Sequence, residues 1–196
     1  MTIPTDRTQP LLIVLSGPSG VGKDAILTEL KKLPGNYLFT VTATTRKIRP
    51  GESNGRDYIF LSAKKFKEAI NAKEFIEWSE VYGNFYGVPR DQIDEALADG
   101  KNAIVKIDVQ GAKTIKQLKL PAIFIFISPP SQSELRDRLK RRMTETPEAL
   151  ELRLDTAISE MAESIWFDYE VINHTGQLRH TAEQISNIIK KDPETN

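Results

Sequence analysis

Short runs of apolar residues recur along the chain at residues 11–16, 103–108, 122–127 and 168–172. Each run is brief and largely continuous rather than alternating, which is typical of a strand that is buried on both faces. Between the runs, apolar residues recur three or four positions apart, the spacing that places them on one face of a helix. Buried strands that alternate with helices predict an α/β fold with a parallel sheet and helices on both of its faces.

Residues that favour helix ends agree with these periodic segments. Ser62 is a good N-cap residue, Pro34 and Gly35 end one segment, and Gly100 ends another. The predicted helices lie at residues 25–32, 63–71, 89–98, 110–118, 131–142, 148–163 and 178–190. The aromatic residues predicted to lie in the core are Phe66, Phe75, Trp78, Trp166 and Phe167.

The interval from about residue 38 to residue 90 has a different pattern. Its apolar and polar residues alternate over short segments, as they do in half-buried strands, and Gly83-Asn84 marks a turn. The basic segment 44–51 contains proline and glycine and is predicted to be a loop. We expect an insertion with a small, partly antiparallel sheet of its own. Its predicted strands lie at residues 37–43, 57–61, 75–78, 80–82 and 85–88.

Composition narrows the classes of protein to consider. With 196 residues we expect one domain, between polar tails at residues 1–10 and 191–196. The formal net charge is zero, which predicts no general attraction to nucleic acid or to a membrane. The chain has no cysteine, which excludes disulfides, thiolate metal sites and cysteine nucleophiles. The longest apolar run is too short to span a bilayer and the first residues do not resemble a signal peptide, so we expect a cytoplasmic protein.

The strongest chemical motif directly follows the first apolar run. It fits the pattern G-x-x-x-x-G-K, between a predicted strand and a predicted helix. Its glycines allow several backbone N–H groups to turn toward a phosphate, and the helix N-terminus adds partial positive charge. An ordinary glycine-rich turn is the alternative, but the flanking strand and helix favour a nucleotide-phosphate site. The motif reads Gly17-Pro18-Ser19-Gly20-Val21-Gly22-Lys23.

Arg46 and Arg49 lie in the predicted loop of the insertion, with Tyr58 and Tyr86 on its predicted strands. Guanidinium groups bind phosphate oxygens bidentately, so this group of side chains would suit a second phosphate. The alternative is a basic loop that is simply solvated.

A further group of arginines lies on two predicted helices joined by the polar turn 144–147. Arginines of a mobile lid would close over transferring phosphates, whereas arginines of a solvated surface would pair with nearby acids. Both interpretations stay open from the residues alone. The group consists of Arg136, Arg138, Arg141, Arg142 and Arg153.

Other motifs follow the glycine-rich loop, and the whole set covers the chain from residue 11 to about residue 190. They are Thr44-Thr45-Arg46, Arg49-Pro50-Gly51-Glu52, Gly55-Arg56-Asp57-Tyr58-Ile59-Phe60, Glu74-Phe75-Ile76-Glu77-Trp78, Gly83-Asn84-Phe85-Tyr86-Gly87, Ile107-Asp108-Val109-Gln110-Gly111 and Pro129-Pro130-Ser131. In order and spacing, this set of motifs resembles guanylate kinases, the GMP kinases among the P-loop nucleoside monophosphate kinases.

The resemblance implies transfer of the γ-phosphoryl group of ATP to GMP, and to dGMP as well, with Mg²⁺ as cofactor. It implies a P-loop NTPase-type three-layer fold with a central parallel sheet, a small mixed-sheet GMP-binding insertion and a short helical lid. The enzyme would serve purine nucleotide metabolism as a monomer or a homodimer. By position, the core covers about residues 11–37, 90–130 and 165–190, the insertion 38–89 and the lid 136–155.

The resemblance also implies roles for individual residues. Glu77 falls on the carboxylate that accepts hydrogen bonds from guanine N1–H and N2–H₂, a donor pair that adenine lacks. The implied ATP site comprises Gly17, Pro18, Ser19, Gly20, Val21, Gly22, Lys23, Asp24 and Asn173. The implied GMP site comprises Thr42, Arg46, Arg49, Tyr58, Glu77, Tyr86 and Asp108. The implied catalytic residues are Lys23, Arg46, Arg138, Arg142 and Arg153.

Three positions depart from the family pattern. Val88 stands where the family usually has a hydroxyl that helps to hold guanine, which predicts GMP binding weaker by ~0.5–1.5 kcal/mol. Asp24 replaces the hydroxyl that normally touches Mg²⁺, and Lys106 stands where an acidic residue is usual. We expect Asp24 to supply an oxygen for Mg²⁺ while Lys106 pairs with it or faces a phosphate. A solvent-facing Asp24 in the first turn of the helix is the alternative.

Two other functions stay open. A non-catalytic scaffold domain of the same fold would bind phosphopeptides through the arginines of the insertion. Such domains tend to lose the loop glycines, Lys23 or the lid arginines, all of which this chain keeps. A related kinase of another phosphorylated acceptor is favoured only by Val88.

Overall fold

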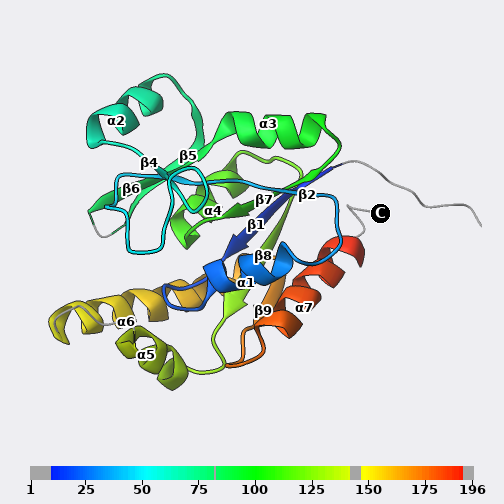
Figure 1. The fold of residues 1–196 in the computed structure, drawn as a ribbon. Coiled ribbons are helices and arrows are strands. Elements are labelled where there is room, and N and C mark those ends of the chain that lie inside the picture. Colours follow the sequence, from blue (N-terminus) through cyan, green and yellow to red (C-terminus); the bar gives the residue numbers. More distant parts are fainter. Residues whose placement is uncertain (1–9, 82, 142–146, 192–196) are drawn as a thin grey trace, which may run out of the picture. The chain divides into compact units, whose positions relative to one another are not determined.

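The computed structural model describes residues 10–81, 83–141 and 147–191 (Figure 1). The tails predicted at residues 1–10 and 191–196 therefore lie almost entirely outside the described residues. The described chain divides into two compact units. The first unit contains the chain from Val14 to Gly35 and from Ile123 onward, and the second contains Asn36 to Ala122 with the start of the first strand.

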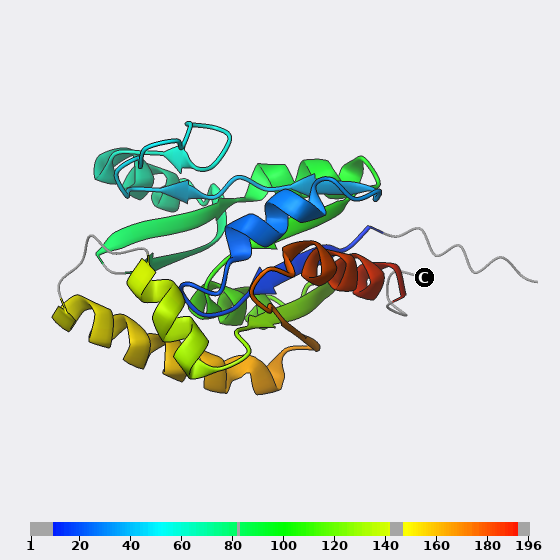
Figure 2. The same ribbon diagram turned by 60° about the horizontal axis from the view of Figure 1, so that its bottom comes forward.

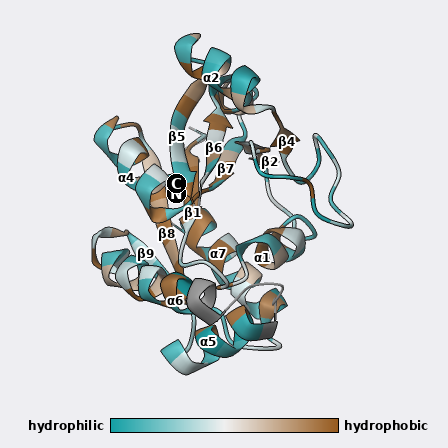
Figure 3. Ribbon diagram, turned by 90° about the vertical axis from the view of Figure 1, so that its left-hand side faces the viewer, coloured by the Kyte–Doolittle hydropathy of each residue, from teal (hydrophilic) through white to brown (hydrophobic). Residues whose placement is uncertain are grey.

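The apolar runs form a five-stranded sheet in the order β2-β7-β1-β8-β9. Pairing is parallel between β2 and β7 and between β8 and β9, as the continuous burial of the runs predicted. All residues of β1 are buried, and β1 and β8 carry the hydrophobic colour in Figure 3. The strands are β1 (Leu12–Ser16), β2 (Tyr37–Phe39), β7 (Asn102–Lys106), β8 (Ala122–Ser128) and β9 (Tyr169–Ile172).

Strands β7 and β2 lie on one side of β1, and strands β8 and β9 lie on the other side. Strand β1 therefore lies where the direction of the strand order reverses. In open α/β sheets, ligands bind outside the carboxyl ends of the strands at such a reversal. The glycine-rich loop starts at Gly17, immediately after the carboxyl end of β1. The topology therefore places this loop where nucleotides bind in this class of fold.

The predicted insertion forms a second, mixed sheet in the order β4-β3-β6-β5. Strand β3 is parallel to β4, whereas the pairs β3–β6 and β5–β6 are antiparallel. The prediction of one strand at residues 37–43 is wrong, because residues 37–39 belong to the parallel sheet and Ala43–Thr44 to the mixed sheet. The strands are β3 (Ala43–Thr44), β4 (Ile59–Phe60), β5 (Phe75–Val81) and β6 (Asn84–Pro89).

Each predicted helix has a counterpart within a few residues of its expected ends. Ser62 caps α2 by accepting a hydrogen bond from the backbone N–H of Lys65, over 3.2 Å. The part of the chain that the structure describes has no helix with the length and apolar composition needed to cross a membrane. The helices are α1 (Lys23–Leu30), α2 (Ala63–Asn71), α3 (Arg90–Ala98), α4 (Val109–Gln117), α5 (Gln132–Arg141), α6 (Pro147–Ala162) and α7 (Leu178–Lys191), with a 3₁₀ turn at Glu163–Trp166.

Each unit has its own packing. In the first unit α1 packs against α7, and α5 and α6 run side by side (Figures 1 and 2) around buried Leu135, Leu139 and Leu154. In the second unit α2 covers the mixed sheet, and the rings of Phe66 and Phe75 stack with centroids 4.6 Å apart. This packing fixes the elements that carry the candidate site residues of each unit.

Trp78 does not lie in the core as predicted, because 44% of it is exposed. A register irregularity between Phe75 and Glu77 in the β5–β6 ladder explains the error. Phe75, Ile76 and Glu77 are consecutive buried residues, after which alternation resumes with Trp78 outside. The strand therefore buries a carboxylate and exposes an indole, which the hydrophobic pattern alone does not predict.

Candidate active site

The glycine-rich loop has the backbone geometry that its sequence predicted. Gly17 has a φ of 146°, and a Cβ atom there would overlap the backbone oxygen of Ile127. Gly22, which is the N-cap residue of α1, has a φ of 102°, and a Cβ atom there would lie 2.9 Å from Nδ2 of Asn173. Helix α1 begins at Lys23, so the N–H groups of its first turn, which have no acceptor within the helix, lie next to the loop.

Lys23 folds back over the loop that precedes it. Its Nζ donates hydrogen bonds to the carbonyl oxygen of Gly17 and, over 3.2 Å, to that of Pro18. The ammonium group is therefore held beside the loop backbone, where its charge and that of the helix N-terminus add. An anionic phosphate is the ligand that this combination suits.

Asn173, which the resemblance assigned to the ATP site, is 3% exposed and supports the glycine-rich loop. Its Nδ2 donates to the carbonyl oxygen of Val21 over 2.8 Å, and its Oδ1 accepts from the hydroxyl of Thr181 over 3.2 Å. The side chain that follows β9 therefore fixes the backbone of the phosphate loop directly.

Two of the predicted lid arginines also contact the loop. Arg138 of α5 donates to the carbonyl oxygen of Val21 over 3.1 Å and to that of Asn173 over 2.7 Å. Arg153 of α6 donates from Nη2 to Oγ of Ser19 over 2.8 Å. Arg142, the third of these arginines, lies outside the described residues.

Acidic residues that sequence reasoning did not assign to the site support these contacts. Glu134 forms an ion pair with Arg138, and the backbone N–H of Ser19 donates to Glu160 over 3.2 Å. The spacing of Glu134 and Arg138, four residues apart on one helix, was a signal that such a pair forms, but it also suits an ordinary surface pair. Arg136 forms such a surface pair with Glu151: its Nη1 lies 3.2 Å from Oε1 of the acid, and both side chains are about half exposed.

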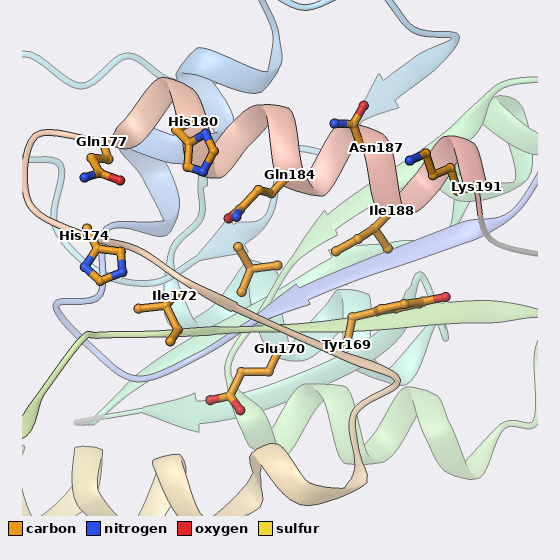
Figure 4. Close-up of a pocket in the computed structure, with 11 residues that line it drawn as sticks. Tyr169, Glu170, Ile172, His174, Gln177, His180, Gln184, Asn187, Ile188 and Lys191 are labelled. Atoms are coloured by element: carbon orange, nitrogen blue, oxygen red, sulfur yellow. The ribbon is translucent and has the colours of Figure 1, made fainter.

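A hollow between β9 and α7 is a separate feature of the first unit. Figure 4 shows His174, His180 and Gln184 among the side chains that line it. The residues predicted for the ATP site do not line this hollow. We therefore do not assign the nucleotide to it.

In the second unit, Glu77 on β5 is a buried carboxylate that is only 3% exposed. Its Oε2 has no hydrogen-bond partner among the residues that the structure describes. Burial, and then repulsion from Asp108, raise the pKa of Glu77 to about 8. A carboxyl group with this pKa is mostly neutral near pH 7, and it accepts a pair of hydrogen bonds from a ligand only after it loses its proton.

Asp108 and Thr42 both lie near the carboxyl end of β7 in the second unit. Asp108 is the N-cap of α4, accepting from the N–H of Gly111 over 2.7 Å and from the hydroxyl of Ser79 over 2.9 Å. The hydroxyl of Thr42 donates to the carbonyl oxygen of Lys106 over 3.4 Å. Gly111 was not predicted as a site residue, yet a Cβ atom there would lie 2.5 Å from Oε2 of Glu77.

Arg46 lies among aromatic rings and beside an acid. Its Nη2 forms an ion pair with Glu52 over 2.8 Å, and its guanidinium carbon lies 5.2 Å from the centre of the Tyr58 ring. The rings of Tyr58 and Tyr86 meet edge to face, with centroids 6.2 Å apart. The structure thus brings three of the predicted residues together, whereas Arg49 is exposed.

Lys106 also joins this group. Its Nζ donates to the hydroxyl oxygen of Tyr58 over 2.9 Å and lies 4.4 Å from the centre of the ring. Asp24, the expected counterpart of Lys106, is an exposed residue in the first turn of α1. The coupling of these two residues stays a prediction.

Comparisons with protein families, with curated proteins and with solved structures all match this chain to guanylate kinases. The family model described as guanylate kinase matches residues 9–192. The guanylate kinases of Gloeobacter violaceus and Carboxydothermus hydrogenoformans are 49% and 42% identical over 163 residues, which is 83% of this chain and 79% and 80% of theirs. The crystal structure of guanylate kinase from Anaplasma phagocytophilum has a TM-score of 0.75 and 33% identity, covering 92% of this chain and 84% of that one. The chain therefore belongs to the guanylate kinase family.

Proposed function

We propose that this chain transfers the γ-phosphoryl group of ATP to GMP, giving ADP and GDP, and that Glu77 selects guanine. Membership of the guanylate kinase family supports the reaction. The observation that carries the specificity is the buried Oε2 of Glu77, which has no partner among the described residues. Guanine presents N1–H and N2–H₂ side by side to such a carboxylate. Adenine would leave the buried oxygens without donors, which is costly.

The phosphate of GMP is proposed to bind at Arg46, Arg49, Tyr58 and Tyr86. A guanidinium group and two phenolic hydroxyls donate to phosphate oxygens, and the short distances from Arg46 to Tyr58 and from Tyr58 to Tyr86 support a common ligand. Arg46 would then exchange part of its ion pair with Glu52 for the phosphate. Thr42 and Asp108 are proposed to contact the guanine side.

The phosphates of ATP are proposed to bind at the loop from Gly17 to Lys23. The N–H groups of the loop and the ammonium group of Lys23 surround the donor phosphates, and Arg138, Arg142 and Arg153 stabilise the phosphoryl group in transfer. The attacking oxygen of GMP is already anionic, so the reaction needs positioning and charge stabilisation rather than a general base.

A site for Mg²⁺ at Asp24 is consistent with the donors present. The described residues contain no group of three or more His, Cys, Asp or Glu that could hold a metal by themselves. Mg²⁺ in kinases is commonly held by one or two carboxylates together with substrate phosphates and water, and Asp24 is an exposed carboxylate next to Lys23. When bound, the ion would neutralise charge on the β- and γ-phosphate oxygens.

The insertion and the lid are proposed to have separate tasks. Residues 38–89 form the GMP-binding insertion, and residues 136–155 form the lid, whose closure would exclude water that would otherwise hydrolyse ATP. The contacts of Arg138 and Arg153 with the loop support this assignment of the lid. We propose that the enzyme acts in the cytoplasm as a monomer or a homodimer.

The test is a coupled assay of ADP release with GMP, dGMP, AMP, CMP and UMP. We expect turnover with GMP and dGMP only, and the variant Glu77→Gln should lose most activity with GMP. The matched control is Glu80→Gln, which removes an exposed charge from the same strand. A scaffold domain would release no ADP with any nucleotide, and a kinase of another acceptor would not prefer GMP.

The same assay with varied Mg²⁺ tests Asp24. Asp24→Ser should shift the Mg²⁺ concentration that half-maximal turnover requires, and Thr28→Ser on the exposed side of the same helix should not. A double-mutant cycle of Asp24→Ser and Lys106→Asp measures the predicted coupling. Additive effects on Mg²⁺-dependent turnover would show that the two residues are independent.

A further inference from the structure

Lys106, the last residue of β7, contacts Tyr58 from a strand to which the proposed reaction assigns no task. We infer that Lys106 is a positioning residue for the Tyr58 hydroxyl and an additional cation for the phosphate of the acceptor nucleotide. The inference rests on the proposed function, because it concerns the same phosphate. The inference goes beyond the proposed function because it assigns phosphate recognition to Lys106, at a position where the family usually has an acid.

The hydrogen bond between the two side chains sets the direction of the Tyr58 proton. An ammonium group can only donate, so the Tyr58 oxygen accepts from Lys106 over 2.9 Å. A phenol has a single proton, which must then point away from the ammonium group toward another acceptor. A phosphate oxygen is a strong acceptor, and the hydroxyl is thereby prepared to donate to it. A neutral or acidic residue at position 106 would not impose this direction.

The charges around Tyr58 show why a second cation is useful. Arg46 lies 5.2 Å from the ring centre, but its guanidinium group is also paired with Glu52 over 2.8 Å. The acceptor phosphate carries close to two negative charges near neutral pH. An ammonium group 4.4 Å from the ring centre adds attraction for such an anion on the Lys106 side of the ring.

The backbone of Lys106 is anchored more firmly than a loop residue would be. Strand β7 pairs with β2 in the parallel sheet, and the carbonyl oxygen of Lys106 accepts from the hydroxyl of Thr42 over 3.4 Å. The side chain is half-buried, so fewer conformations compete with the one that reaches Tyr58. Tyr58 itself lies just before the two-residue strand β4. The sheet thus anchors the residue that contacts Tyr58, which itself lies outside the regular strands.

Comparison of GMP with guanosine as ligands tests the inference, because the two differ only in the phosphate. In Lys106→Met, we expect the dissociation constant of GMP to rise about tenfold or more, the loss of a charge-assisted hydrogen bond. Guanosine affinity should change less than about twofold, and the thermal midpoint should stay near that of wild type. Lys101→Met, which removes the same charge just before the other end of β7, should leave both ligands unaffected.

Two further variants separate positioning from charge alone. Lys106→Arg should restore most of the GMP affinity, and Lys106→Met combined with Tyr58→Phe should lose less than the sum of the single losses. Equal losses for GMP and guanosine, no loss in Lys106→Met, or additive losses with Tyr58→Phe would each overturn the inference. A wild-type protein that binds GMP no better than guanosine would instead contradict the proposed GMP-phosphate site.

Discussion

Val88 of β6 lies directly opposite Glu77 of β5 in the antiparallel ladder of the mixed sheet. Opposite residues project on the same face of a sheet, so a fully buried apolar side chain flanks the carboxyl group that is proposed to select guanine. This neighbour cannot donate a hydrogen bond to the carboxylate, and it adds to the burial that disfavours the charged form. This neighbour helps to explain why Glu77 combines a raised pKa with a buried oxygen that has no hydrogen-bond partner among the described residues.

GMP affinity is predicted to rise with pH up to about pH 9. The pKa of Glu77 is raised to about 8 by burial and by Asp108, so most of the free protein carries a neutral carboxyl near pH 7. Guanine donors require the carboxylate, and binding should therefore release about one proton at pH 7. Isothermal titration calorimetry in buffers of different ionisation enthalpy measures this release. Affinity should rise about fivefold from pH 7 to pH 8 and level off about twofold higher above pH 9, and Glu77→Gln should abolish the rise; proton-independent binding would contradict the prediction.

Glu77→Gln is also predicted to stabilise the ligand-free protein at alkaline pH. The pKa of Glu77 in the folded protein lies above its ordinary value, so ionisation destabilises the fold progressively as pH rises from about 4.5 toward 8. Below pH 4.5 the carboxyl group is neutral in both states and this difference vanishes. The thermal midpoint of Glu77→Gln should exceed that of wild type at pH 8.5, and the excess should shrink toward pH 4.5. An excess that does not depend on pH would mean that packing, not charge, is responsible.

Local chemistry made the phosphate loop predictable from the sequence. A glycine-rich turn between a buried strand and a helix depends on residues that are neighbours in the chain, and α1 begins at Lys23, two residues before the predicted start. The same holds for Ser62, whose capping role depends on Lys65 only three residues away. Such features need no knowledge of the tertiary structure.

Other parts of the site depend on contacts that no local pattern reveals. Residues 37–43 have a continuous strand-like sequence, and only the positions of β7 and β6 decide that the chain changes sheets near Thr40. The contact of Lys106 with Tyr58 joins residues 48 positions apart, so its spacing carries no signal. The exposure of Trp78 follows from an irregularity in strand register, which a hydrophobic pattern does not encode.

Val88→Thr is predicted to tighten GMP binding. The substitution nearly conserves volume and places a hydroxyl beside Glu77, at the position where the family usually has one. We expect the dissociation constant of GMP to fall by about twofold to tenfold, the value of one hydrogen bond. Val81→Thr at the far end of the same hairpin is the matched control. Unchanged affinity would remove Val88 from the guanine site, and wild-type turnover of AMP equal to that of GMP would remove Glu77 as well.

Gly111→Ala is predicted to impair guanine recognition although alanine favours helices. The new Cβ atom would lie 2.5 Å from Oε2 of Glu77, so the carboxyl group must move. KM for GMP should rise about tenfold or more, because a displaced carboxylate cannot accept both guanine donors. Gln110→Ala changes an exposed residue of the same helix and should leave KM unchanged. Normal kinetics for Gly111→Ala, measured in the ADP-release assay, would show that Glu77 has room to retreat without loss.

Arg153→Met is predicted to lower turnover alone, whereas Arg138→Met is predicted to lower both turnover and thermal stability. Arg153 donates to the hydroxyl of Ser19, so its loss should lower kcat about a hundredfold or more with little change in thermal midpoint. Arg138 holds the backbone carbonyls of Val21 and Asn173, so its loss should lower both kcat and the thermal midpoint. Stopped-flow kinetics and calorimetry on the same preparations measure both quantities.

Arg136→Met is the matched control for these two variants, since Arg136 lies on the same helix as Arg138 and its charge also has an acidic partner. Its pair with Glu151 is exposed, and exposed pairs contribute little to stability because water screens them. Its kcat and thermal midpoint should therefore remain those of wild type. If Arg136→Met lowers kcat as much as Arg153→Met does, the arginines act through the general charge of the two helices. The contact of Arg153 with Ser19 would then have no special role in transfer.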